Sequence, residues 1–238
     1  MHFKQIILFF SAVFVLASCS QPEFVDRPAD NTSNRILIDA SHDGGVWWYP
    51  QAGTYDHNQA HQGSLLAAYL RSRGFVVDEI PSYIPVTDSL LSIYSNVIRA
   101  GNYGSYSTAE LNAYDKLISR GGSLFLISEF LQPGSQDQLA SHLGLNFGGT
   151  KYAQLDSFAV HPAVTGATSF YYNAGSYVLN QHTNPDIEVL GWLDHDPNLP
   201  AMGILHHPKA RIFFIGDFNG IEGMPQPVVS TIVKWLFR

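Results

Sequence analysis

Short apolar segments that alternate with amphipathic segments constrain the fold of this chain more than any other feature of its sequence. The clearest of them, Ser123–Ile127, is apolar at every position after the serine. A strand that is apolar on both faces belongs in the middle of a parallel sheet that helices cover on both sides. Further strands are predicted at 35–39, 75–78, 96–100, 187–193, 202–206 and 211–217.

The helical segments between these strands carry their own boundary signals. Ser107-Thr-Ala-Glu110 is a capping box, in which the serine and glutamate side chains each accept a hydrogen bond from the other's backbone N–H. Gly121 and Gly122 end the helix that this box begins. Other helices are predicted at 59–73, 87–91 and 136–142, with a last one from Pro225 or Pro227. This alternation predicts an α/β fold, a three-layer sandwich with a mostly parallel, flavodoxin-like sheet.

The only cysteine, Cys19, lies near the start of the chain and follows Leu16-Ala17-Ser18. Lys4 and the apolar run 6–16 precede it, which is the layout of a secretory signal. The run is shorter than the about 20 apolar residues that a spanning helix needs. Leu-Ala-Ser-Cys matches the bacterial lipobox, so residues 1–18 are predicted to be a lipoprotein signal peptide and Cys19 the acylated residue. The alternative is an ordinary cleaved signal with an incidental cysteine.

The composition after the signal indicates a tether followed by one domain. Residues 19–34 hold prolines, acids and amides and little that could pack, so a flexible tether is expected. Residues 35–238 fit a single domain. The net charge of −7 argues against nucleic acid as a partner, because phosphates require Lys and Arg. Aromatic residues at 13% and charged residues at only 14% are typical of proteins that bind neutral ligands such as carbohydrate.

Several motifs in their order along residues 35–238 resemble those of a known group. They are Ile36–His42, Gly74–Val77, Tyr106–Leu111, Gly121–Leu126, His161–Gly166 and Phe213–Asp217. Together they resemble the class I glutamine amidotransferase-like superfamily, in its uncharacterised branch related to the GIFT and ThuA-like domains. The resemblance implies the fold of that superfamily for the whole of residues 35–238.

The same resemblance argues against the reaction of the superfamily. In its catalytic members, the strand equivalent to Ser123–Ile127 leads into a turn that reads Gly-x-Cys-x-Gly. Here the turn reads Ile127-Ser128-Glu129-Phe130-Leu131, without a glycine or a cysteine. Amidotransfer needs a thiolate to attack the amide carbon, and no Gly-x-Ser-x-Gly surrounds Ser128 as a substitute. We therefore expect no glutamine amidotransferase activity.

Polar residues follow several of the predicted strands. Ligands of such sheets bind beyond the carboxyl ends of the strands, so these residues are candidates for a site at one edge. They are Asp39, Ser41, His42, Asp43, Asn102, Tyr103, Ser128, Glu129, Asp217 and Asn219. The candidates for catalysis among them are His42, Asp43, Ser128 and Glu129, since a histidine beside an acid can act as a base or ligate a metal. The alternative is that Ser41 and His42 only hold the loop in place.

Two further interpretations concern aromatic and histidine residues. Trp47, Trp48 and Tyr49 are consecutive in a glycine-rich loop, where at least one ring could stack on a sugar or another ring. The predicted ligand-binding residues are Trp47, Trp48, Asn102, Tyr103 and Asp217; packing of the aromatic rings over the sheet edge is the alternative. Three short segments could supply metal ligands: His57 with His61, His206-His207, and Asp194-His195-Asp196. Adjacent strand residues point apart, so no metal site and no cofactor are expected.

These features favour a lipid-anchored protein of the cell envelope, in the outer membrane and facing the periplasm, since Ser20 rather than an aspartate follows Cys19. Its amidotransferase-like domain is expected to be a non-catalytic binding or assembly module with a carbohydrate or envelope-protein partner. A hydrolase that acts on carbohydrate or ester substrates is the alternative, with Ser128, His42 and either Glu129 or Asp217 as a triad. A metal-dependent enzyme is a third class.

The anchor leads to a direct test. Cys19→Ser removes the acylation site, and without acyl chains the chain loses the stable membrane attachment that several acyl chains provide. We expect the variant to move from the membrane fraction to the soluble fraction, as followed by immunoblot after ultracentrifugation. A Cys19→Ser variant that stays with the membranes would contradict the predicted anchor.

Overall fold

The computed structural model describes residues 34–43, 63–80, 82, 84–223 and 226–237, and within them a single nine-stranded sheet in the order β2-β1-β3-β4-β9-β8-β7-β5-β6. The strands are β1 Arg35–Asp39, β2 Val76–Ile80, β3 Asn96–Ala100, β4 Ser123–Ile127, β5 Phe147–Phe158, β6 Phe170–Val178, β7 Ile187–Leu193, β8 Pro200–His206 and β9 Arg211–Ile215. The helices are α1 Ser64–Ser72, α2 Asp88–Leu91, α3 Thr108–Ser119, α4 Gln138–His142, α5 Phe218–Gly223 and α6 Gln226–Leu236, and Pro162–Val164 forms one 3₁₀ turn.

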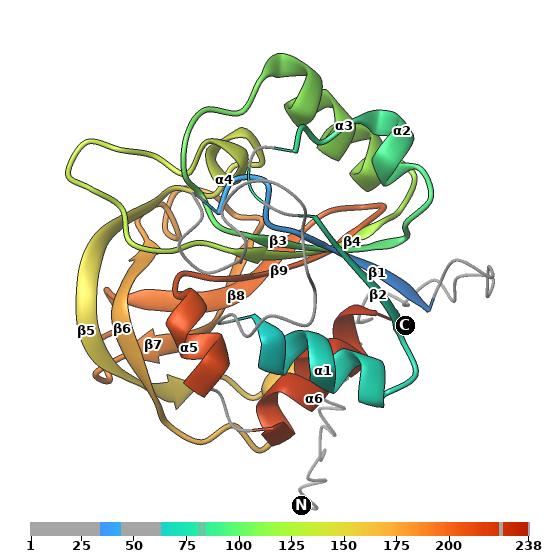
Figure 1. Ribbon diagram of the computed structural model, residues 1–238. Coiled ribbons are helices and arrows are strands. Elements are labelled where there is room, and N and C mark those ends of the chain that lie inside the picture. Colours follow the sequence, from blue (N-terminus) through green and yellow to red (C-terminus); the bar gives the residue numbers. More distant parts are fainter. Residues whose placement is uncertain (1–33, 44–62, 81, 83, 224–225, 238) are drawn as a thin grey trace, which may run out of the picture.

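Helices cover the sheet on both faces, so the predicted three layers are present (Figure 1). Helices α2, α3 and α4 contribute to one hydrophobic core, and α1, α5 and α6 contribute to the other. Successive residues of a strand supply the two cores in turn: Phe125 and Ile127 belong to one, and Leu124 and Leu126 belong to the other. This follows from the two-residue period of a strand, and it explains why β4 is apolar throughout.

The sheet is mixed, so the prediction of a mostly parallel, flavodoxin-like sheet is not confirmed. Strands β2, β1, β3, β4 and β9 are joined by four parallel pairings. The other four pairings, which join β9, β8, β7, β5 and β6, are antiparallel. The difference arises after α4, where the chain no longer crosses the sheet through a helix and instead continues through successive antiparallel strands. Helical crossovers are what parallel neighbours require.

Strands β5 and β6 were not predicted from the sequence. β5 includes Gly148 and Gly149 and a register shift between Gly148 and Lys151, and it alternates irregularly between buried and exposed positions. A bulge of this kind breaks the strict apolar alternation by which a half-buried strand is identified. The short helix α5 was also missed, whereas the predicted capping box is present, with Ser107 and Glu110 each accepting from the other's backbone N–H.

The first part of β5 and the paired part of β6 form a hairpin arm, residues 147–154 and 171–178. Within the arm β5 pairs with β6, and its pairing with β7 begins only at Leu155. The arm curls back onto the parallel half, where the backbone N–H of Ser176 donates to the carbonyl oxygen of Gly216, at 2.7 Å. A Cβ atom at Gly216 would overlap the Ser176 carbonyl oxygen, so only glycine allows this approach. The arm therefore closes over the carboxyl end of β9.

The loops that follow β1 and β3 contact each other at the point where the strand order reverses. The backbone N–H of Tyr103 donates to the carbonyl oxygen of His42 at 2.7 Å. Between these strands Gly101 has a φ of +89°, and a Cβ atom there would overlap the Cα of Asp43. Ligands of such sheets usually bind at this position. Here the two loops can meet only because residue 101 is a glycine.

No helix of the described ranges combines the length and apolar character that crossing a membrane demands. The predicted lipid anchor, the tether up to residue 33 and the 59–62 part of the predicted first helix lie outside the described residues.

Substitution of Gly101 by alanine tests the loop contact. Gly134→Ala is a matched control, because Gly134 also has a positive φ, +85°, but nothing lies within 4 Å of the position of its Cβ atom. We expect Gly134→Ala to lower the free energy of unfolding by about 1 kcal/mol, from backbone strain alone. Gly101→Ala should lower it by about 2–4 kcal/mol, since overlap with backbone adds to the strain. Urea unfolding measures both, and equal losses would show that the loops do not meet at Gly101.

Candidate functional site

The structure brings the predicted polar residues to one edge of the sheet. Asp39, Ser41, His42 and Asp43 follow β1, Asn102 and Tyr103 follow β3, Ser128 and Glu129 follow β4, and Asp217 and Asn219 follow β9. Because β1, β3, β4 and β9 are parallel neighbours, their carboxyl ends lie side by side. Most of these side chains are buried rather than open to solvent. The polar residues at this edge therefore form an internal network. The hydrogen bonds of each residue determine whether it could bind a ligand or take part in catalysis.

His42 uses both of its ring nitrogens in contacts within the protein. Nδ1 lies 2.9 Å from the carbonyl oxygen of Tyr103, so it carries a proton and donates it, because a carbonyl only accepts. Nε2 lies 3.2 Å from Oε1 of Glu110, and the ring stacks on Tyr106 with 3.7 Å between centroids. No ring nitrogen is left to accept a proton from Ser128. The contacts correspond to the alternative interpretation in which His42 holds its loop.

Glu110 is a site residue that sequence reasoning recognised only as a helix cap. Its Oε2 accepts from the backbone N–H and the hydroxyl of Ser107, both at 2.8 Å, while Oε1 lies beside His42. Burial opposes ionisation of Glu110, but the hydrogen bonds from Ser107 and then from His42 outweigh it, so the pKa of Glu110 lies below its usual value. The capping box thus also anchors the loop after β1 to α3.

A second group of contacts that the sequence did not reveal surrounds Arg99, which is fully buried in β3. Its guanidinium donates to Oδ2 of Asp137 at 2.6 Å and to the carbonyl oxygen of Gly101. Burial opposes the charge on Arg99, yet Asp137 and then Tyr106 raise its pKa above the usual value. Asp137 also accepts from the backbone N–H of Ala140, which caps α4. One buried ion pair therefore ties the β3 turn to α4.

Asp39 is also engaged within the network. It accepts from the backbone N–H of Ser41 at 2.9 Å and from the hydroxyl of Tyr114 on α3. Burial, followed by the charge of Asp39, raises the pKa of Tyr114 well above its usual value. The acid at the end of β1 therefore positions backbone and helix, and it is not available at the surface.

Ser128 lies in the turn that follows β4, and its side chain is 0% exposed. Its Oγ accepts from Nδ2 of Asn102 at 3.2 Å, and its backbone N–H donates to the carbonyl oxygen of Ile215 at 2.8 Å. The described hydrogen bonds join Ser128 to β3 and β9 and not to His42. A nucleophile needs both a base and an open path to its substrate. Ser128 has neither in this conformation.

Glu129 and Asp217 form a buried carboxylate pair, 1% and 0% exposed. Oε2 of Glu129 accepts from the backbone N–H of Phe218 at 2.8 Å, and Oδ2 of Asp217 accepts from the backbone N–H of Asn173 at 2.6 Å. Burial, followed by the charge of Asp217, raises the pKa of Glu129 to about 8. Asn173 belongs to the hairpin arm, so the arm itself takes part in burying this pair.

The remaining predicted residues lie elsewhere. Cys19, Trp47, Trp48, Tyr49, His57 and His61 are outside the described residues. His206 pairs with Glu188 at 2.9 Å, and His195 lies in the turn between β7 and β8 with its backbone N–H donating to Asp156. Among the described residues, no three His, Cys, Asp or Glu side chains are grouped so that they could hold a metal ion.

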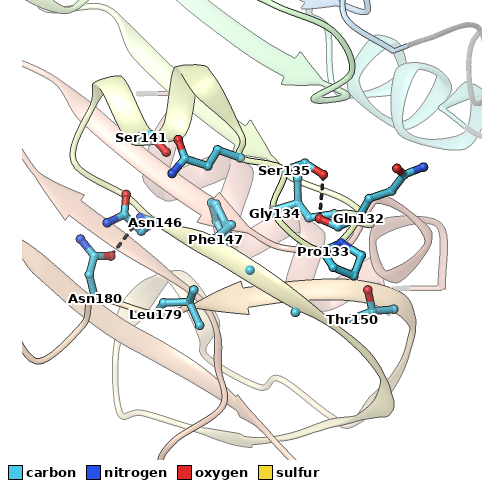
Figure 2. Close-up of a pocket in the computed structure, with 14 residues that line it drawn as sticks. Gln132, Pro133, Gly134, Ser135, Ser141, Asn146, Phe147, Thr150, Leu179 and Asn180 are labelled. Carbon is cyan, nitrogen blue, oxygen red and sulfur yellow. Dashed lines mark hydrogen bonds between the residues drawn. The ribbon is translucent and has the colours of Figure 1, made fainter.

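An open groove of about 670 Å³ lies beside the carboxyl end of β4, and sequence reasoning missed it (Figure 2). Three segments line it: the loop after β4 together with the last turn of α4, the start of β5, and the residues that follow β6. The lining residues are Leu131, Gln132, Pro133, Gly134, Ser135, Gln136, Ser141, Asn146, Phe147, Gly148, Gly149, Thr150, Leu179 and Asn180. None of them is acidic, basic or a histidine. No local sequence signal marks the groove, because only the fold brings these segments together.

Comparison with known proteins supports the fold. No protein-family model matches the chain, and no curated protein matches its sequence. Among solved structures, the mmIFT52 N-terminal domain has a TM-score of 0.60 at 14% identity, over 85% of this chain and 97% of that one. A ThuA-like protein from Bacteroides uniformis has a TM-score of 0.56 at 16% identity, over 90% and 95% of the two chains. A β-galactosidase from Bacillus circulans has a TM-score of 0.54 at 11% identity, over 86% of this chain and 31% of that one.

Identities this low show the fold alone. The chain has the fold of ThuA-like proteins, which agrees with the glutamine amidotransferase-like resemblance of its motifs.

The carboxylate pair predicts how stability depends on pH. The unfolded chain releases the Glu129 proton near pH 4.5, whereas the folded chain keeps it until about pH 8. Stability from this group is therefore complete below pH 4.5 and is lost as the pH rises to 8, by an amount on the order of a few kcal/mol. Urea unfolding at a series of pH values should show this decline in the wild type.

Two variants separate the pair from other titrating groups. Glu129→Gln keeps a carbonyl oxygen for Phe218 without a charge, and Asp217→Asn removes the neighbouring charge. Glu129→Gln should abolish the decline in the free energy of unfolding between pH 4.5 and 8. Asp217→Asn should reduce this decline, because burial also raises the pKa of Glu129. A wild-type free energy of unfolding that stays level over this range, or variants that decline as steeply as the wild type, would show that the pKa of Glu129 is not raised in this way in the folded chain.

Proposed function

We propose that this chain is a lipid-anchored protein of the bacterial cell envelope whose amidotransferase-like domain binds a ligand or partner and does not catalyse a reaction. The observation that carries the proposal is the state of Ser128. The turn after β4, which carries the nucleophile in the resembling superfamily, here holds a hydroxyl that is fully buried and bonded to Asn102. No substrate atom can approach it without a rearrangement of the edge.

The neighbours of Ser128 support the same conclusion. The ring nitrogens of His42 contact Tyr103 and Glu110, so they provide no base. The hairpin arm covers the end of β9, the strand beside β4, at the edge where an amidotransferase-like site would be open. A fold can retain its scaffold while its function resides in a different site. Binding or assembly is the role that remains for such a scaffold.

The location of this role follows from the first residues of the chain. An acylated Cys19 with the tether 19–34 would hold the domain at the outer membrane, on the periplasmic side. Carbohydrate and other envelope proteins are the partners within reach there. The excess of acidic residues disfavours nucleic acid.

A hydrolase is the second candidate, and one observation favours it. The pKa of Glu129 is raised to about 8, and acids with raised pKa values are common at catalytic sites, where they donate protons near neutral pH. A catalytic role for Glu129 would require the arm to open, because the residue is only 1% exposed.

The two candidates are separated by an assay of the full chain, purified in detergent, against nitrophenyl esters and glycosides. We expect no release of nitrophenol above the detergent blank. Ser128→Ala should lower the free energy of unfolding by about 1–3 kcal/mol, because it leaves the buried amide of Asn102 unpaired. Ser105→Ala, at an exposed serine, is the control for stability. Turnover that Ser128→Ala or Glu129→Gln abolishes would establish the hydrolase instead.

A further inference from the structure

We propose that the groove beside β4 binds a neutral oligosaccharide chain, and that the chain continues along β5 over Tyr152 and Tyr171. This inference rests on the proposed binding function and names its ligand. The groove is defined by the fourteen lining residues given above, all of them in the described part of the chain (Figure 2).

The chemistry of the lining selects a neutral, hydroxyl-rich ligand. No lysine, arginine or histidine lines the groove to neutralise an anion, and no carboxylate lines it to bind a cation or a metal. Its polar side chains are amides and hydroxyls: Gln132, Gln136, Asn146, Asn180, Ser135, Ser141 and Thr150. An amide offers both a donor and an acceptor, as does each hydroxyl of a sugar. Leu179, which is 56% exposed, adds apolar surface that the C–H face of a sugar ring can contact.

Several of these side chains are available for a ligand. Within the described part of the chain, the side-chain polar groups of Gln132, Gln136, Asn146 and Thr150 take no part in any hydrogen bond, and the first three residues are exposed. A polar group that water alone satisfies in the empty groove can exchange that water for a sugar hydroxyl at little cost. The groove thus presents unused donors and acceptors on two of its sides.

The frame that carries these groups is held in place before any ligand binds. Asn180 accepts from the backbone N–H of Asn146 at 2.9 Å and donates to the carbonyl oxygen of Gly144 at 2.9 Å. Asn184 donates to the same carbonyl at 2.8 Å. On the β5 side, a Cβ atom at Gly148 would lie 2.6 Å from Cδ1 of Leu179, so the glycine lets Leu179 pack against the strand. A preformed frame reduces the entropy lost on binding.

The path beyond the groove follows β5. Tyr152 lies two residues after Thr150, about 7 Å farther along the strand. It is 67% exposed, and Tyr171 on β6 is 51% exposed. Tyr152 is paired with Asn173, and Tyr171 is paired with Gln154, so two rings and two amides share one face of the arm. Exposed rings flanked by amides are the surface that a sugar chain can stack on while its hydroxyls are hydrogen-bonded.

The test uses the full chain in a detergent without a sugar headgroup, and the probes are linear β-linked hexasaccharides of glucose, mannose and N-acetylglucosamine. Oligogalacturonate is the anionic comparison, and an uncharged decapeptide of Ser, Asn and Gly is the peptide comparison. Titration calorimetry gives each Kd. We expect at least one neutral hexasaccharide to bind and the two comparisons not to bind.

Paired variants locate the binding. Asn146→Asp removes a donor and adds an unpaired charge to the neutral groove, so the Kd should rise about tenfold. Asn112→Asp makes the same change on the exposed surface of α3 and should leave the Kd unchanged. Tyr152→Ala should weaken the hexasaccharide about three- to tenfold while Tyr152→Phe, which keeps the ring, does not.

Each other outcome overturns a defined part of the proposal. A hexasaccharide that binds equally well to the wild type, Asn146→Asp and Tyr152→Ala would leave the binding function in place and remove the groove as its site. Binding of only the decapeptide or only oligogalacturonate, or of no probe, would show that neutral sugar is the wrong ligand class. Cleavage of the hexasaccharides, seen as new reducing ends, would refute the proposed non-catalytic function itself.

Discussion

The backbone hydrogen bond from Ser176 to Gly216 closes the antiparallel half of the sheet over the parallel half, and the rest of the edge depends on it. In this position of the arm, the backbone N–H of Asn173 donates to Asp217. Glu129, beside Asp217, is buried. A Cβ atom at Gly216 would prevent the contact. The close approach of the arm to the end of β9 therefore requires a glycine at position 216.

Burial of polar groups is unfavourable unless they find partners, and several members of the network find them in different ways, although Oγ of Ser41, Nε of Arg99 and the hydroxyl of Tyr106 make no hydrogen bond in the described part of the chain. Arg99 is paired with Asp137, and His42 lies between Tyr103 and Glu110. Glu129 instead has its pKa raised, so that at neutral pH it remains largely protonated beside Asp217. The side chains of this edge are thus engaged with one another and with the backbone. The groove beside β4 lies outside this network.

The structural neighbours are consistent with this separation of scaffold and site. The same fold occurs in a ThuA-like protein and, over about a third of its length, in a β-galactosidase. A scaffold used in such different proteins does not by itself define a reaction. This chain combines a buried serine after β4, a hairpin arm over the end of β9 and a groove without charged side chains.

The sequence by itself determined the parallel half of the fold: β4 and β9 are apolar at every position after the first, α3 begins at a complete capping box, and polar residues follow the strand ends. These signals are local, so they can be recognised in the sequence without knowledge of the fold. The tertiary structure alone decided the direction of the second half, the pairing of Arg99 with Asp137, the second role of Glu110 and the existence of the groove. Each of these features depends on contacts between residues far apart in the chain, such as Gly216 with Ser176 or Asn146 with Asn180. A sequence pattern within one segment cannot show which distant segment will lie beside it.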